Sequence, residues 1–301
     1  MKQLYLFRLL QRTIMYVLVV MAIVGVSMSA VAAQPPRGGT RPMVAYEFTS
    51  ISAGIQHTCA LTSVGTIYCW GDNANGQLGI GSLVSKSTPT LVKQPTGVTF
   101  RTVSASGNHT CALSTINKAY CWGSNSSGQL GNGTTTNSNV PAAVSTPAGV
   151  TFTRLQIGWA HTCALTNTNV AYCWGNNDYG NVGNGQSDLR FTIPMRVSMP
   201  TGIAFATITA GQYHSCAMTT NKKAYCWGTN VFGALGSWPP DNKRNKPVEV
   251  ANVLLNDDGG VSGLSAGGQF SYLCHRCQCL SGQIYLVLGS CRYRTARVWD
   301  V

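Results

Sequence analysis

The sequence predicts an all-β fold made of repeated four-stranded units, and three observations lead to this prediction. A stretch that begins with HTCAL at His57 returns from His109, His161 and His214, at intervals of 52, 52 and 53 residues. Self-similarity at such a period is typical of repeat architectures. Gly, Ser, Thr and Asn are abundant and only 10% of residues are charged, which suits short strands joined by tight turns. We found no long segment with the apolar spacing of an amphipathic helix.

Each unit contains four short segments that are bounded by turn residues, as strands are. The first begins at an aromatic residue that recurs as Phe48, Phe100, Phe152 and Phe205, and in the last three copies a Pro marks the turn into it. The second segment is His-Thr-Cys-Ala-Leu and the third is Tyr-Cys-Trp-Gly. The fourth follows a Gly-rich loop, near Pro89–Val92 in the first copy. Four strands per unit is the content of one β-propeller blade.

The units divide the chain into blades. A fifth copy opens as SAGGQFS at Ser265, where the first copy has SAGIQHT, and then loses the pattern. We therefore expect four complete blades and a degraded fifth, over residues 44–94, 95–146, 147–199, 200–250 and 251–270.

The first 33 residues resemble a targeting segment. Lys2, Arg8 and Arg12 precede an apolar run, Ile14–Val26, and small residues follow at 30–33. The alternative is an uncleaved anchor, because the run approaches the roughly 20 residues that span a bilayer. Apart from such an anchor we expect no contact with a membrane. Both interpretations place the repeats in an exported position, secreted or at the cell surface, after a Pro/Gly-rich linker at 34–43.

Eight of the twelve cysteines form four pairs in which the partners are ten residues apart. Gly65, Asn117, Asn169 and Asn221 lie near the midpoints, as turn residues would. Facing residues of a hairpin have a Cα separation that a disulfide accepts. Export favours disulfides, and the alternative is eight buried thiols. The predicted bonds are Cys59 to Cys69, Cys111 to Cys121, Cys163 to Cys173 and Cys216 to Cys226.

A histidine and a tryptophan occupy the same position in every unit. An active site needs its residues once, in one asymmetric arrangement. We therefore interpret both sets as architecture, with the imidazoles buried against backbone groups and the indoles filling space between blades. These residues are His57, His109, His161 and His214, and Trp70, Trp122, Trp174 and Trp227.

The formal net charge of +12 suggests nucleic acid as a partner, but its distribution does not. Between residues 44 and 270 there are 12 basic and 8 acidic side chains, a net charge of +4. Counterion-driven binding needs clustered cations. We expect a protein partner instead.

The motifs of an enzyme are missing from the sequence. Its nine carboxylates form no paired motif of the glycosidase kind, and it has no phosphate-binding glycine motif or nucleophile elbow. The run Cys274–Cys279 resembles metal ligands by residue type alone, with no second cluster at a suitable distance. We predict no catalysis, no metal and no cofactor.

Residues 271–301 diverge from the repeat, with neither YCWG nor GQLG and with four cysteines in the 18 residues from Cys274 to Cys291. Back-translation with a one-base shift allows TCAIDA from Tyr272 and a TWCWDPAGTAQLGYGT segment further on. We hypothesise that this tail is a frameshifted final repeat, which the gene sequence would test.

The pattern AGxxHTCAL, YCWGxNxxGQLGxG and PxxV over residues 44–270 resembles the repeat of the regulator-of-chromosome-condensation family. The third copy departs from it at Asn181-Val182 and the fourth at Ala234. The resemblance implies a β-propeller, seven-bladed in the founding members, which are nucleotide-exchange factors for a small GTPase on chromatin. Secreted bacterial relatives include an inhibitor of β-lactamases. Cysteine stands where cytoplasmic relatives usually have small apolar residues, so the exported bacterial type is the better analogue.

Four or five blades do not complete a seven-bladed ring. We therefore expect an incomplete, open ring with an unpaired sheet at one end. Such an end favours self-association.

The copies differ mainly in their loops, as expected of a repeated scaffold that presents a binding face. Tyr179, Phe232 and Trp238 are candidate interface aromatics, and the alternative is that they pack within their own loops. We predict a scaffold that binds proteins or cell-surface components. One alternative is a secreted hydrolase, which an unrepeated acid or His pair in the central channel would favour. Another is a nucleotide-exchange regulator of a GTPase, which export disfavours.

Overall fold

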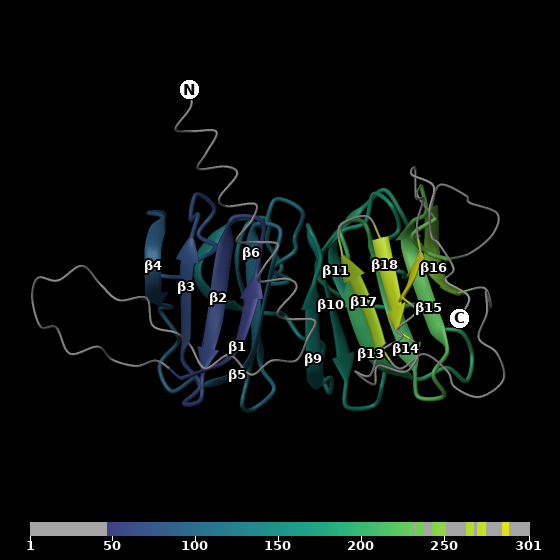
Figure 1. Cartoon of the computed structure of the whole chain (residues 1–301), viewed down its shortest axis with the longest axis horizontal. Coiled ribbons are helices and arrows are strands. Elements are labelled where there is room, and N and C mark those ends of the chain that lie inside the picture. The colour runs from purple at the N-terminus through teal and green to yellow at the C-terminus, as the bar shows by residue number, and fades with distance from the viewer. Residues whose placement is uncertain are drawn as a thin grey trace, which may run out of the picture. The chain divides into compact units, whose positions relative to one another are not determined.

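The computed structural model describes residues 47–231, 233–236 and 243–250, and the backbone of three further strands between residues 263 and 288 (Figure 1). Every regular element in this part of the chain is a β-strand, so the all-β prediction is confirmed. No membrane-spanning helix occurs among the described residues. The predicted targeting segment and linker, Phe232, Trp238 and most of the divergent tail lie outside them.

The strands form four antiparallel sheets of four strands and one of three, each in sequential order. The first sheet consists of β1 (Phe48–Ala53), β2 (His57–Thr62), β3 (Ile67–Gly71) and β4 (Lys86–Leu91). The second consists of β5 (Phe100–Ser106), β6 (His109–Ser114), β7 (Ala119–Gly123) and β8 (Ser138–Ala143). The third consists of β9 (Phe152–Ile157), β10 (His161–Thr166), β11 (Ala171–Asn176) and β12 (Arg190–Arg196). The fourth consists of β13 (Phe205–Ala210), β14 (His214–Thr219), β15 (Ala224–Thr229) and β16 (Lys243–Glu249). The fifth consists of β17 (Gly263–Gly267), β18 (Phe270–Cys274) and β19 (Tyr285–Leu288).

The central hairpin of each blade has the register that its cysteines require. Cys59 faces Cys69 across β2 and β3, and the other three blades repeat this pairing. The turns are tight because Gly65, Asn117 and Asn169 adopt positive φ angles of 80°, 63° and 62°. In the fourth blade the left-handed residue is Lys222, with φ of 65°, rather than its neighbour Asn221. Lys222 is the equivalent position, because it lies six residues after Cys216, as Gly65 lies six residues after Cys59.

The hydrophobic core lies between blades rather than within them. One cluster combines Cys59, Leu61 and Leu78 of the first blade with Phe100 and Trp122 of the second. The next two clusters repeat this arrangement with the second and third blades and with the third and fourth. Each blade therefore presents a disulfide-bearing face to the aromatic face of its successor, as solenoid and propeller repeats do.

The described blades form an unclosed ring. Each sheet packs on the next through its innermost strands, β1 on β5, β5 on β9, β9 on β13 and β13 on β17. Among the described strands, those of the first sheet make no extensive contact with the third, fourth or fifth. The predicted open ring of blades is thus confirmed for this part of the chain.

Candidate binding surfaces

All eight repeated cysteines are fully buried and form the four predicted disulfides, which join Cys59 to Cys69, Cys111 to Cys121, Cys163 to Cys173 and Cys216 to Cys226, each with a Cα separation of 4.1 Å. Each disulfide crosslinks the two central strands of one blade. Intrachain disulfides of this kind are typical of extracellular proteins.

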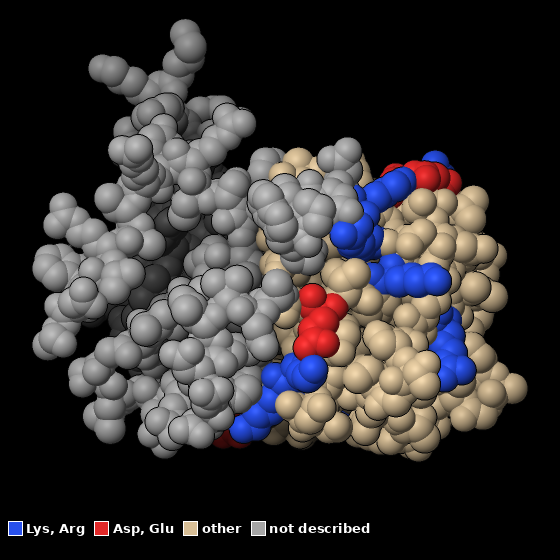
Figure 2. All heavy atoms as spheres, turned by 90° about the vertical axis from the view of Figure 1, so that its right-hand side faces the viewer, with Lys and Arg blue, Asp and Glu red and all other residues tan. Residues whose placement is uncertain are grey.

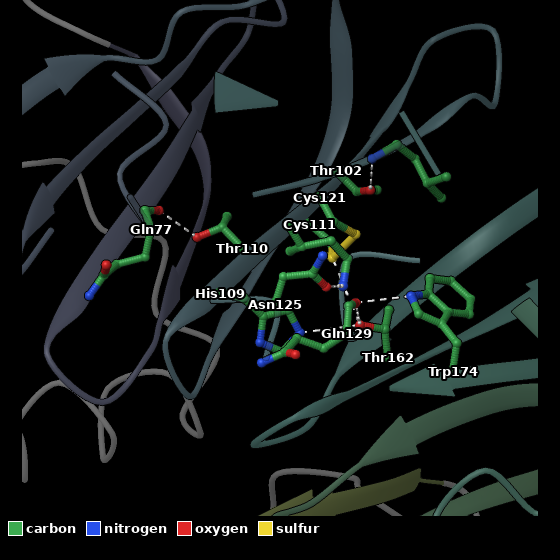
Figure 3. The surroundings of a disulfide bond; sticks show 12 residues. Gln77, Thr102, His109, Thr110, Cys111, Cys121, Asn125, Gln129, Thr162 and Trp174 are labelled. Atoms are coloured by element: carbon green, nitrogen blue, oxygen red, sulfur yellow. Dashed lines mark hydrogen bonds between the residues drawn. A yellow bond between two sulfur atoms is a disulfide. The ribbon is translucent and has the colours of Figure 1, made fainter. Parts of the chain in front are cut away.

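The repeated histidines link each blade to the next (Figure 3). His109 Nε2 lies 3.2 Å from Thr162 Oγ1, and that hydroxyl donates to the backbone carbonyl of Gln129 at 2.8 Å. The hydroxyl has one hydrogen and gives it to the carbonyl, so the imidazole must be the donor of the first bond. His57 with Thr110 and Gln77, and His161 with Ser215 and Asn181, repeat the arrangement.

This geometry leaves the imidazoles neutral and enclosed. Nδ1 of His57, His109 and His161 carries no proton and is buried without a hydrogen-bond partner among the described residues. Burial lowers the pKa to about 4 for His57 and to about 3 for His109 and His161. An imidazole that neither solvent nor a substrate can reach has a structural role and does not act as a catalytic base.

The repeated tryptophans lie at the same blade interfaces. Trp122, Trp174 and Trp227 are fully buried, and the Trp174 indole donates to the Gln129 carbonyl at 2.9 Å. Trp70 is partly exposed, because no described blade precedes the first.

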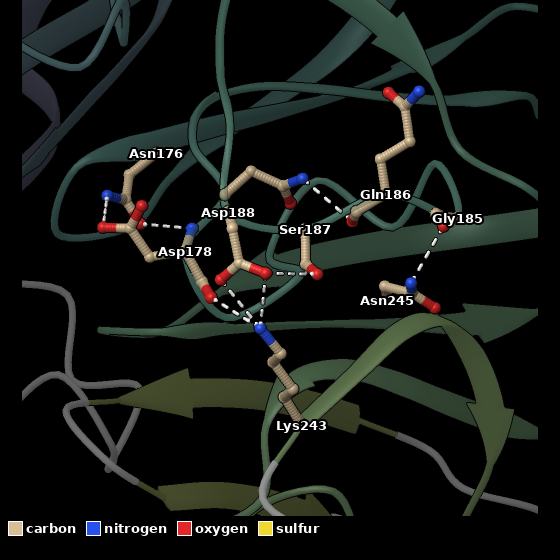
Figure 4. Close-up of polar contacts among 9 residues, drawn as sticks. Asn176, Asp178, Gly185, Gln186, Ser187, Asp188, Lys243 and Asn245 are labelled. Atoms are coloured by element: carbon tan, nitrogen blue, oxygen red, sulfur yellow. Dashed lines mark hydrogen bonds and ion pairs between the residues drawn. The ribbon is translucent and has the colours of Figure 1, made fainter.

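Two carboxylates of the third blade lie in the loop after β11, where Lys243 of β16 joins them (Figure 4). The Lys243 ammonium forms an ion pair with Asp188 at 2.8 Å and donates to the backbone carbonyl of Asp178 at 3.4 Å. The hydrogen bond from Lys243 lowers the pKa of Asp188. The Asp178 carboxylate accepts from Asn176 at 2.7 Å. These groups fasten the third blade to the fourth.

The innermost strands β1, β5, β9 and β13 line a hollow of about 910 Å³. Hydroxyl and amide side chains dominate the lining, which includes the cations Arg101 and Arg154. No carboxylate and no imidazole is among the described lining residues. The acid or histidine pair that would favour a hydrolase is therefore not found in this part of the hollow.

A second candidate surface is built from turns at one end of the blades. In each blade the turn between the first two strands and the loop between the last two lie at the same end, as the hydrogen bond from Asp72 N to Gln56 O shows at 2.7 Å. We call the turns 158–160 and 211–213 and the loop 177–189 the turn surface. Tyr179 is 39% exposed and its ring centroid lies 5.1 Å from that of Tyr213. Tyr179 thus combines exposure with a contact to the next blade.

Trp159 also lies on the turn surface, and the sequence analysis missed it. It is 42% exposed, and its backbone amide donates to the Gly211 carbonyl of the neighbouring turn at 3.3 Å. The sequence did contain a signal for Trp159. It stands two residues before the repeated histidine, where the other three complete copies have Ile55, Gly107 and Gln212.

Charged side chains do not gather into one basic area on the face shown in Figure 2. Lys and Arg appear as separate patches there, some of them beside Asp or Glu. This distribution agrees with the small net charge of the repeats and does not favour nucleic acid as a partner.

Comparison with known proteins identifies the repeats. A family model described as "RCC1-like domain" matches residues 24–273. The ultraviolet-B receptor UVR8 of Arabidopsis thaliana is 32% identical over 186 residues, which cover 62% of this chain and 42% of UVR8. The human probable E3 ubiquitin-protein ligase HERC6 is 30% identical over 221 residues, which cover 72% of this chain and 21% of HERC6. The chain thus spans less than half the length of each of these relatives.

Solved structures show the same fold. Prp20p from Saccharomyces cerevisiae superposes with a TM-score of 0.66 and 24% identity, covering 76% of this chain and 56% of that one. Human WBSCR16 superposes with a TM-score of 0.65 and 23% identity, covering 73% of this chain and 56% of that one.

Proposed function

We propose, from the premise that this chain belongs to the family of RCC1-like domains, that it is an exported scaffold which binds another protein or a cell-surface component through its blade loops. It carries out no chemistry of its own. The four disulfides support export, because such bonds persist in oxidising compartments.

The observation that carries this proposal is the exposure of large aromatic residues on the turn surface. Trp159 and Tyr179 are exposed, whereas the repeated Trp122, Trp174 and Trp227 are fully buried. Trp and Tyr are the residues that most often dominate binding energy in protein interfaces. The scaffold does not need an exposed tryptophan at residue 159, since the other blades fold with smaller or polar residues there.

The two alternatives have weaker support. A hydrolase would need a catalytic constellation, and the described lining of the hollow offers guanidinium, hydroxyl and amide groups. Regulation of a GTPase draws on Prp20p, whose binding to Gsp1p and histones has been described. An exported chain is separated from cytoplasmic GTPases.

Capture of partners by the purified protein, from surface extracts of the producing organism, tests the proposal. We expect the Trp159→Ala/Tyr179→Ala double variant to capture at least about tenfold less of the principal partner, since an interface anchor contributes about 2 kcal/mol or more. The matched control is Val64→Ala/Ile116→Ala, which truncates exposed apolar residues on hairpins at the other end of the blades. Equal loss in both variants, or in neither, would contradict binding through the turn surface.

A further inference from the structure

The hollow contains two arginines that the repeat does not require. Arg101 follows Phe100 on β5, and the equivalent residues in the other blades are Thr49, Thr153 and Ala206. Arg154 lies on β9, where the other blades have Ser50, Thr102 and Thr207. At each position three of the four blades fold without a cation, so stability of the blade does not explain the two arginines.

The two guanidinium groups differ in how they are held. Arg101 Nη2 donates to Asn117 Oδ1 and to the Thr153 carbonyl, both at 2.8 Å, which fixes it across the second and third blades. Arg154 is exposed and has no hydrogen-bond or ion-pair partner among the described residues. The hollow therefore holds one anchored cation and one whose donors are available to a ligand.

The surroundings do not neutralise this charge. The described lining contains no carboxylate, and a concave wall of low dielectric strengthens the field of the cations within it. A guanidinium binds carboxylate or phosphate through two parallel hydrogen bonds. The hollow thus favours an anionic ligand.

The size and remaining chemistry of the hollow favour an extended peptide. At about 910 Å³ it is large for a single small anion and lies within the range of ligand pockets. Gln156, Asn167 and Asn169 offer amide donors and acceptors that match a peptide backbone. A nucleic acid would need more clustered cations than two.

We propose that the hollow binds an acidic peptide segment, with Arg154 pairing a carboxylate of that segment and Arg101 providing a second positive charge. This proposal deepens the proposed function, since it names the chemistry of a partner segment. The proposal rests on the proposed function in one respect, because it assumes that the partner is a protein.

Binding of fluorescein-labelled decaglutamate to the purified protein, followed by fluorescence anisotropy, tests the hollow directly. We expect saturable binding that weakens as salt is added. Arg154→Gln should weaken it by about tenfold or more, because the variant loses the charge-assisted hydrogen bonds to the carboxylate. Arg154→Lys should restore part of the affinity. Arg101→Gln should also weaken binding. The control is Arg196→Gln, which removes the same charge from an exposed position on the outer strand β12, away from the hollow.

Three outcomes would overturn the proposal: no binding of decaglutamate, an equal loss in Arg196→Gln, or tighter binding of a single-stranded oligonucleotide or of inorganic phosphate than of the peptide. Partner capture is independent of this assay. Loss of decaglutamate binding with intact capture refutes the hollow alone, whereas failed capture with intact decaglutamate binding refutes the turn surface alone.

Discussion

At the scale of single residues, a repeated polar triplet joins neighbouring blades. An imidazole of one blade donates to a hydroxyl of the next, and that hydroxyl donates to a loop carbonyl of the first. All three groups are fully buried or nearly so, and an unsatisfied partner would cost about 1–3 kcal/mol. The triplet therefore accounts for the return of His in the first three repeats and of Thr or Ser in the second, third and fourth.

The neutral imidazoles predict that the protein loses stability in mild acid. Burial lowers the pKa of His57 and His214 to about 4 and that of His109 and His161 to about 3, against 6.5 for an unperturbed group. Below pH 6.5 the unfolded chain binds protons that the folded chain does not. The contribution of the neutral histidines to the free energy of unfolding is therefore complete above pH 6.5. It falls as the pH drops toward 4, by about 1.4 kcal/mol per pH unit for each histidine.

Denaturant unfolding at pH 7, 6 and 5 measures this dependence, in a window above the ordinary titration of carboxylates. We expect the free energy of unfolding to fall steeply from pH 6 to pH 5. In His161→Gln the slope should be smaller by about one proton, because the glutamine amide can donate to Ser215 but does not titrate. A flat profile in the wild-type protein would contradict neutral buried imidazoles.

At the scale of strands and blades, much of the fold could be predicted from local sequence. The ten-residue spacing of the cysteines, with a turn residue between them, specifies the central hairpin and its register. The left-handed turn residue of the fourth blade was predicted one position too early, at Asn221, because Asn adopts that conformation more readily than Lys.

Contacts between blades could not be predicted from the sequence. Thr162 meets His109 across 53 residues, and no local pattern specifies which loop carbonyl the hydroxyl reaches. Repetition marked His109 as architectural, but the expected partner was a backbone group and the observed partner is a hydroxyl of the next blade. The candidate sites were missed in part for the same reason, since Arg101 and Arg154 enter one hollow only after four blades are assembled. Tyr179 was identified because it stands in a loop that varies between copies.

At the scale of the whole molecule, the repeated residues build a scaffold, and the binding groups that we propose are unrepeated residues. Consecutive blades share a core made of one disulfide face and one aromatic face, so each blade needs a neighbour on both sides.

The most direct test of the blade-by-blade scaffold and of its proposed export is a disulfide map of the unreduced protein, isolated from the cells that produce it and digested without reductant. We expect mass spectrometry to find four crosslinks, each between the two cysteines of one blade, and no crosslink between blades. Free thiols at these eight positions would contradict assembly in an oxidising compartment. Crosslinks between different repeats would contradict the blade itself.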